Sequence, residues 1–118
     1  MNPDELKKRT KEFAHSCVKL VVTLPKMPLR EHIGLQSIRC STSAAANYRT
    51  TIHSQSKAAF ISKESIVIEE ADKSEFWLKF IIDEKLLPRQ KVLPLYSGAH
   101  ELASIFITTR KTAQGRKQ

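Results

Sequence analysis

The sequence predicts an all-α protein, an antiparallel up-down-up-down four-helix bundle that forms a single domain over residues 1–118. The length of 118 residues favours one hydrophobic core. Apolar residues recur at intervals of three, four and seven along four long segments, which is the helical period. Three Gly and five Pro are too few for the frequent turns of an all-β chain. Short connections between the four segments predict antiparallel neighbours.

The first helix is expected over about residues 3–24. Asn2 is a suitable N-cap, Pro3 fits the first helical position, and Glu5 completes a capping box. Pro25 should end the helix, because proline disfavours helical backbone in the residue before it. The apolar stripe of this helix is Leu6, Phe13, Cys17, Leu20 and Leu24.

The second helix is expected over about residues 29–53, with an apolar stripe that includes Ile33, Cys40, Ala44 and Tyr48. Its middle is rich in Ser, Thr and Asn, which have weak helix propensity. We therefore expect a helix that is held by packing against its neighbours.

The third helix is expected over about residues 57–85 with Ser56 as N-cap, and the fourth over about 88–111. Pro94 predicts either a kink in the fourth helix or a start near Leu93. The polar tail 112–118 should fray. The stripes are Phe60, Val67, Ala71, Ser74, Leu78 and Ile81, then Val92, Leu95, Ala99, Leu102 and Phe106.

Three large apolar residues of the third helix, Ile66, Trp77 and Phe80, lie off its stripe and widen its apolar surface. A wide apolar surface on a bundle helix indicates a subunit interface. The alternative is partial cover of these side chains within one chain.

A group of polar residues is expected to have structural roles. Ser43 and Asn47 are four residues apart, so they share one helix face. We interpret them as a buried pair that hydrogen-bonds across the bundle and fixes its packing. The alternative is a contact with a ligand or RNA. Arg39 and Arg49 are expected to form ion pairs, within one chain or between subunits. The candidate acids are Glu69, Glu70 and Asp72 of the third helix. Contact of these arginines with phosphate is the alternative.

Catalytic and metal-binding patterns are missing from the sequence. The four histidines lack the Glu-x-x-His spacing of a di-iron bundle, and no nucleophile elbow or phosphate loop occurs. We therefore expect no enzyme, no metal and no cofactor. Cys17 and Cys40 should be reduced, buried thiols. With neither a signal peptide nor an apolar run that could span a bilayer, the sequence predicts a cytoplasmic protein without a membrane partner.

Four short motifs carry a resemblance to a known family. They lie at residues 37–43 (SIRCSTS), 43–49 (SAAANYR), 56–61 (SKAAFI) and 69–78 (EEADKSEFWL). In combination they resemble the four-helix-bundle proteins that are encoded in 23S ribosomal RNA intervening sequences. The likeness extends over roughly residues 3–112.

The resemblance implies a ring-like homopentamer. A related branch is the accessory variability protein of diversity-generating retroelements, which binds nucleic acid and a reverse transcriptase. The branch linked to ribosomal RNA has no established biochemical activity. Where the family tends to carry Glu, this chain has Thr50 and Ala59, which leaves its surface more basic.

Charge is the most informative feature for function. The chain has 20 Lys and Arg against 12 Asp and Glu, a formal charge of +8. Residues 64–87 carry a net charge of −4, whereas 1–30, 31–63 and 88–118 carry +4, +3 and +5. In an up-down-up-down bundle both chain ends and the start of the third helix meet at one end. The expected basic residues of that end are Lys7, Lys8, Arg9, Lys11, Lys57, Arg110, Lys111, Arg116 and Lys117.

The sequence therefore predicts a non-enzymatic, oligomeric bundle that binds RNA or DNA, or is associated with ribosomal RNA. Binding to phosphate would be largely independent of base sequence and steeply dependent on salt. A solvated surface that only aids solubility is the alternative for the basic end. The alternative function is a protein–protein adaptor that uses the acidic third helix or the apolar surface around Trp77.

Overall fold

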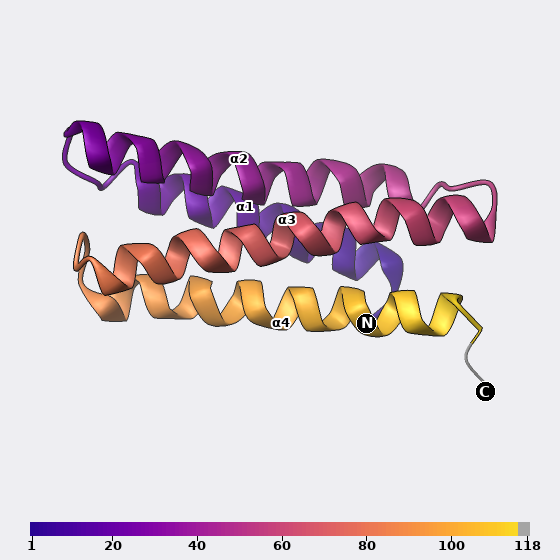
Figure 1. Cartoon of the computed structure of the whole chain (residues 1–118). Helices are drawn as coiled ribbons and strands as arrows, with labels where there is room; N and C mark the ends of the chain where they lie inside the picture. The colour runs from indigo at the N-terminus through magenta and orange to yellow at the C-terminus, as the bar shows by residue number, and fades with distance from the viewer. Residues whose placement is uncertain (116–118) are drawn as a thin grey trace.

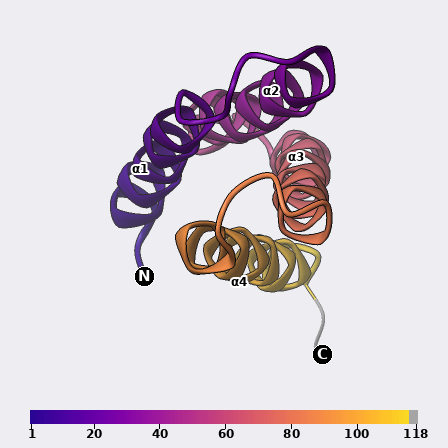
Figure 2. The ribbon, with the colours of Figure 1, turned by 90° about the vertical axis from the view of Figure 1, so that its left-hand side faces the viewer.

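The computed structural model of the chain describes residues 1–115 and contains four helices, α1 (Pro3–Val21), α2 (Pro28–Thr51), α3 (Lys57–Asp83) and α4 (Arg89–Ala113). Each helix runs antiparallel to the one before it, in a bundle of 47 × 23 × 21 Å (Figure 1). Seen along its axis, the helices follow one another around a shared core (Figure 2). The predicted all-α, up-down-up-down four-helix bundle is confirmed.

The predicted starts of α1 and α3 are confirmed by their caps. The Glu5 amide donates to Asn2 Oδ1 at 2.8 Å, and the Asn2 amide donates to Glu5 Oε1 at 2.9 Å, so the capping box is complete. At α3 the Ala59 amide donates to Ser56 Oγ at 3.0 Å. These side chains satisfy amide groups that have no partner inside the helix.

Each helix ends two or three residues from its predicted C-terminus, and α2 and α4 begin one residue from their predicted starts. α1 ends at Val21 rather than at 24, and the Thr23 hydroxyl donates to the Leu20 carbonyl at 2.6 Å in the turn that follows. α3 ends at Asp83 because Lys85 has left-handed backbone with φ 55°. α4 continues to Ala113, so the first two residues of the predicted tail are helical, and residues 116–118 of that tail lie outside the described part.

Pro94 lies inside α4, which begins directly after Pro88. The start near Leu93 that was one of the two expectations is therefore wrong. Because Pro94 falls in the second turn, it removes one hydrogen bond, to the carbonyl of Gln90, and the turn before it still forms.

Hydroxyl groups along α2 bond to the carbonyls of the same helix. Ser37 Oγ donates to the Ile33 carbonyl at 3.0 Å, and Thr51 Oγ1 donates to the Asn47 carbonyl at 2.7 Å. Both side chains are fully buried. Buried hydroxyls need partners, so this bonding lets a sequence of low helix propensity line the core.

The core follows the predicted stripes. Phe106 of α4 packs on Tyr48 of α2 with 5.1 Å between the ring centres. Both cysteines are buried and free, and burial raises the pKa of Cys17 to about 12, offset in part by a hydrogen bond with Ser41. Buried residues from the stripes include Leu6, Phe13, Cys17, Leu20, Ile33, Cys40, Ala44, Val67, Ala71, Leu78, Ile81, Val92, Ala99 and Leu102.

The four helix pairs do not touch equally. α2 packs closely on both α1 and α3, and α3 on α4, whereas α1 and α4 make the least contact. A glycine permits the close approach of α1 and α2, because a Cβ atom on Gly34 would lie 2.7 Å from Val21 Cγ1.

Candidate functional site

The end of the bundle that holds the N-terminus carries most of the predicted basic residues. The start of α1, the connection between α2 and α3, and the end of α4 all lie there (Figure 1). The Lys57 ammonium group lies beside Gly115, which follows α4. Arg116 and Lys117 lie outside the described residues.

A groove of about 440 Å³ runs between α1 and α2 at this end. Lys7 and Lys11 line it from α1, since residues four apart share a helix face. Arg49 lines it from α2, and Ala45 and Ala46 leave room between the helices. Among residues 1–115, none of the three cations forms an ion pair. The groove therefore gathers three positive charges that are available to an anion.

Two other predicted basic residues have partners within the chain. Arg9 of α1 forms an ion pair with Glu101 of α4. Arg110 Nη1 donates to Ser65 Oγ at 3.2 Å, and its side chain is partly buried. Both arginines therefore stabilise contacts between helices. Lys8 and Lys111 are exposed and form no ion pair among the described residues, so they extend the basic surface.

Beneath this end lies a buried carboxyl group, Glu64 of α3. Its side chain is fully buried, and neither of its oxygens has a hydrogen-bond partner within residues 1–115. Burial raises the pKa of Glu64 to about 7, because the ionised form loses its hydration, and the charge of Arg110 opposes this rise. Glu64 is four residues after Phe60 and three before Val67, so it lies on the same helix face as the apolar stripe. This spacing is the sequence signal that could have predicted the burial of Glu64.

Ser43 and Asn47 form a hydrogen-bonded pair, but within α2 and not across the bundle. Asn47 Nδ2 donates to Ser43 Oγ at 3.0 Å and to the Ser43 carbonyl at 2.8 Å. Both residues are only partly buried. The prediction of a buried bond across the bundle is wrong, because at a spacing of four the amide already reaches a hydroxyl and a carbonyl on its own helix.

The predicted arginine pairs are not formed within one chain. Arg39 and Arg49 are exposed, as is Asp72, and no ion pair joins them in the described part of the chain. The acids that were candidates on α3 have another partner, since Lys73 lies 3.4 Å from Glu69 and 3.3 Å from Glu70. Pairing between subunits stays a prediction.

The residues predicted at an interface differ in exposure. Ile66 is 46% exposed, whereas Trp77 and Phe80 are half-buried and pack against the core. Packing within one chain therefore covers part of the Trp77 and Phe80 side chains, as the alternative to a subunit interface expected. Phe76 was not among the predicted interface residues, and it is 55% exposed, with its ring centre 5.0 Å from that of Trp77.

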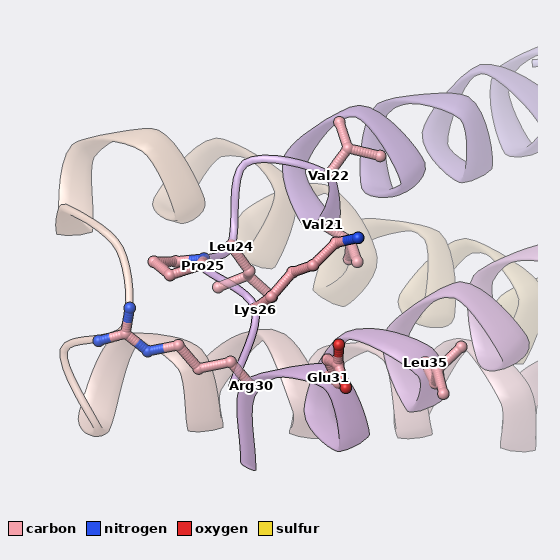
Figure 3. A pocket seen from close by; sticks show the side chains of 8 residues that line it. All are labelled: Val21, Val22, Leu24, Pro25, Lys26, Arg30, Glu31 and Leu35. Carbon is pink, nitrogen blue, oxygen red and sulfur yellow. The ribbon is translucent and has the colours of Figure 1, made fainter. Parts of the chain in front are cut away.

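An apolar pocket of about 500 Å³ lies at the other end of the bundle, where α1 joins α2 (Figure 3). Val21, Val22, Leu24 and Pro25 contribute one side and Leu35 of α2 the other. Lys26, Arg30 and Glu31 also line it, and the side chains of Arg30 and Glu31 leave α2 in different directions (Figure 3). The mixed charge here contrasts with the uniformly positive groove at the N-terminal end.

Neither a metal cluster nor a membrane span occurs in the part of the chain that the structure describes. Within residues 1–115, no three side chains of His, Cys, Asp and Glu lie together as metal ligands would. No helix of this region combines the length and the apolar character that crossing a bilayer requires.

Comparisons with known proteins bear on the fold. No protein-family model and no curated protein sequence matches the chain. A solved structure from Bacteroides thetaiotaomicron matches with a TM-score of 0.79 and 29% sequence identity. It covers 94% of this chain and 99% of the other.

That neighbour is from the S23 ribosomal protein family. It is described as a protein with unknown function. The match supports the resemblance at the level of a helical-bundle family, over nearly the whole length of both chains. The link to the retroelement accessory protein stays a prediction.

Proposed function

We propose that this chain is a non-enzymatic nucleic-acid-binding or ribosomal-RNA-associated bundle that contacts phosphate through its basic end. The observation that supports this proposal is the groove between α1 and α2, where Lys7, Lys11 and Arg49 surround one concavity and form no ion pair among residues 1–115. Contacts from Lys and Arg to phosphate carry no base sequence, so binding through them would depend little on sequence. The neighbour from a ribosomal protein family is consistent with an RNA association.

The proposal includes assembly as a homopentamer, by the family resemblance. Five copies would repeat the groove around a ring, and the summed sites would bind a long nucleic acid far more tightly than one site. Light scattering tests this part. A mass of five chains of 13.4 kDa would support the ring, and a monomer at working concentration would refute it.

Binding is tested with fluorescent RNA and DNA over a series of salt concentrations. Each phosphate contact to duplex contributes about −0.9 to the slope of log K against log salt, so three contacts in one groove predict roughly −2.7. The double variant Lys7→Glu, Lys11→Glu should reduce the slope to about −0.9 or abolish binding.

The matched control is Lys19→Glu, Lys91→Glu. Both lysines are exposed and lie outside the basic end, and the control has the same net charge as the groove variant. If the two double variants lose affinity equally, overall charge rather than the groove governs binding. If the wild type binds neither RNA nor DNA at low salt, the proposal fails.

A further inference from the structure

A second groove, between α3 and α4, has the opposite charge to the first and a partly aromatic lining. It has a volume of about 280 Å³. Three carboxylates line it, Asp72, Glu75 and Asp83, together with Lys79. Three aromatic rings complete the lining, those of Phe76, Phe80 and Tyr96.

The charge of this groove is only partly compensated. Lys79 Nζ lies 2.6 Å from Asp83 Oδ1, so this lysine forms an ion pair with one of the three acids of the groove. Glu75 Oε2 lies 3.0 Å from His100 Nδ1. Asp72 is exposed and forms no ion pair with any residue of 1–115. The groove therefore has a net negative charge, in the one segment of a +8 chain where acids outnumber bases.

Two of these rings, Phe76 and Phe80, form an aromatic cluster with Trp77 of the same helix. The ring centre of Phe76 lies 5.0 Å from that of Trp77 and 6.0 Å from that of Phe80. Phe76 is 55% exposed, which leaves much of its ring in contact with water. An exposed phenyl ring on a charged helix face is a point at which a partner could bury apolar surface.

We propose that this groove, defined by Asp72, Glu75, Phe76, Phe80 and Tyr96, binds an arginine-rich segment of a partner protein. A guanidinium group stacks on aromatic rings and at the same time donates to carboxylates, and its apolar stem covers ring surface. The lining offers rings and carboxylates together, so it matches both requirements of arginine. The carboxylates would repel an anionic partner. A purely apolar partner would remove water from the carboxylates without replacing the lost hydrogen bonds.

The net charge of the chain makes the test selective. With a formal charge of +8, the protein as a whole repels a cationic peptide, so attraction must arise from a local surface. The groove lies on α3 and α4, whereas the proposed phosphate-binding groove lies on α1 and α2. The two proposals can therefore fail independently.

The experiment is a titration of the full-length protein with an oligo-arginine peptide, measured by calorimetry and by the fluorescence of Trp77. Trp77 is the only tryptophan of the chain, and it contacts Phe76 and Phe80. We expect saturable binding that perturbs this fluorescence, and weaker binding of oligo-lysine, because the ammonium group lacks a planar face for stacking. Absence of binding at low salt would overturn the proposal.

Matched variants locate the site. Asp72→Lys should weaken peptide binding about fivefold or more, and Phe76→Ser about fivefold, the size of a single exposed cation–π or ion-pair contact. The control Glu12→Lys makes the same charge change on α1, at an exposed residue of a helix that does not pack on α3. The control Leu35→Ser removes an apolar side chain that is 64% exposed on α2.

If the variants and their controls lose affinity for the peptide equally, the proposal is overturned. Overall charge or general hydrophobicity would then explain the binding. The mass of each variant is measured in parallel by light scattering. A change of mass on Asp72→Lys or Phe76→Ser would show that a second copy of this chain, rather than a cationic partner, occupies the groove. Unchanged RNA affinity of Asp72→Lys would show that the two grooves act separately.

Discussion

Replacing Glu64 by Gln should remove a pH dependence from the stability of the bundle. The side chain is fully buried and the pKa of its carboxyl is raised from 4.5 to about 7. In the unfolded chain the group ionises near pH 4.5, so between pH 4.5 and 7 the folded state binds a proton that the unfolded state has lost. Stability therefore falls as pH rises through this window, and is lowest above it.

The magnitude follows from the size of the pKa change. One pKa unit corresponds to about 1.4 kcal/mol, so a rise from 4.5 to about 7 costs the folded protein about 3 kcal/mol above pH 7. Arg110 reduces this cost but does not cancel it, because burial is the larger effect. A cost of this size is a large fraction of the stability of a small domain.

The assay is urea unfolding of wild type and Glu64→Gln from pH 5 to 8. We expect the wild type to lose about 2.5 kcal/mol more than the variant over this range, since part of the full effect already lies below pH 5. All other ionisable groups are the same in both proteins, so their contributions cancel in the difference. The control Glu84→Gln removes an exposed carboxylate at the end of α3 and should follow the wild type. Identical pH slopes for wild type and Glu64→Gln would refute the reasoning.

Four further predictions concern single positions and are measured by urea or thermal unfolding. Gly34→Ala should destabilise by about 1 kcal/mol, because its Cβ would lie 2.7 Å from Val21 Cγ1, and unchanged or increased stability would contradict this. Gly98→Ala is its counterpart, since the nearest atom is Phe13 Cδ1 at 3.9 Å, and it should stabilise by about 0.5–1 kcal/mol through helix propensity. Lys85→Gly should raise stability by about 1 kcal/mol because φ is 55° there, and a loss would show that the side chain makes a compensating contact. Ser56→Ala should cost about 1 kcal/mol through loss of the cap on α3, whereas Ser97→Ala, at an exposed position within α4, should have little effect.

Most of the fold could be predicted because the apolar period and the caps are local properties of the sequence. Leu6, Phe13, Cys17 and Leu20 share one face of any helix that contains them, and Asn2 caps with atoms only three residues away. The ends of α1 and α3 were less predictable. They depend on local backbone geometry, such as the left-handed residue Lys85, for which glycine would have been the usual signal.

The candidate site could be predicted only in part. The spacing of Lys7 and Lys11 places them on one face, and the topology brings the chain ends together. That Arg49 lies across the groove from them depends on how α2 is rotated about its axis, which is decided by packing of the whole core. The pairing of Arg9 with Glu101 joins positions far apart in the sequence, and the sequence holds several other acids that could have served.

The sparse contact between α1 and α4 has a consequence for folding kinetics. The extensive helix contacts join elements that are consecutive in the chain, α1 with α2, α2 with α3 and α3 with α4. Such a pattern has low contact order, for which rapid folding is expected. The pairing of α1 with α4 requires closure of the longest loop and offers the smallest contact. We therefore expect it to form last and to open first, so that amide hydrogens along this seam exchange earlier than those of α2 and α3.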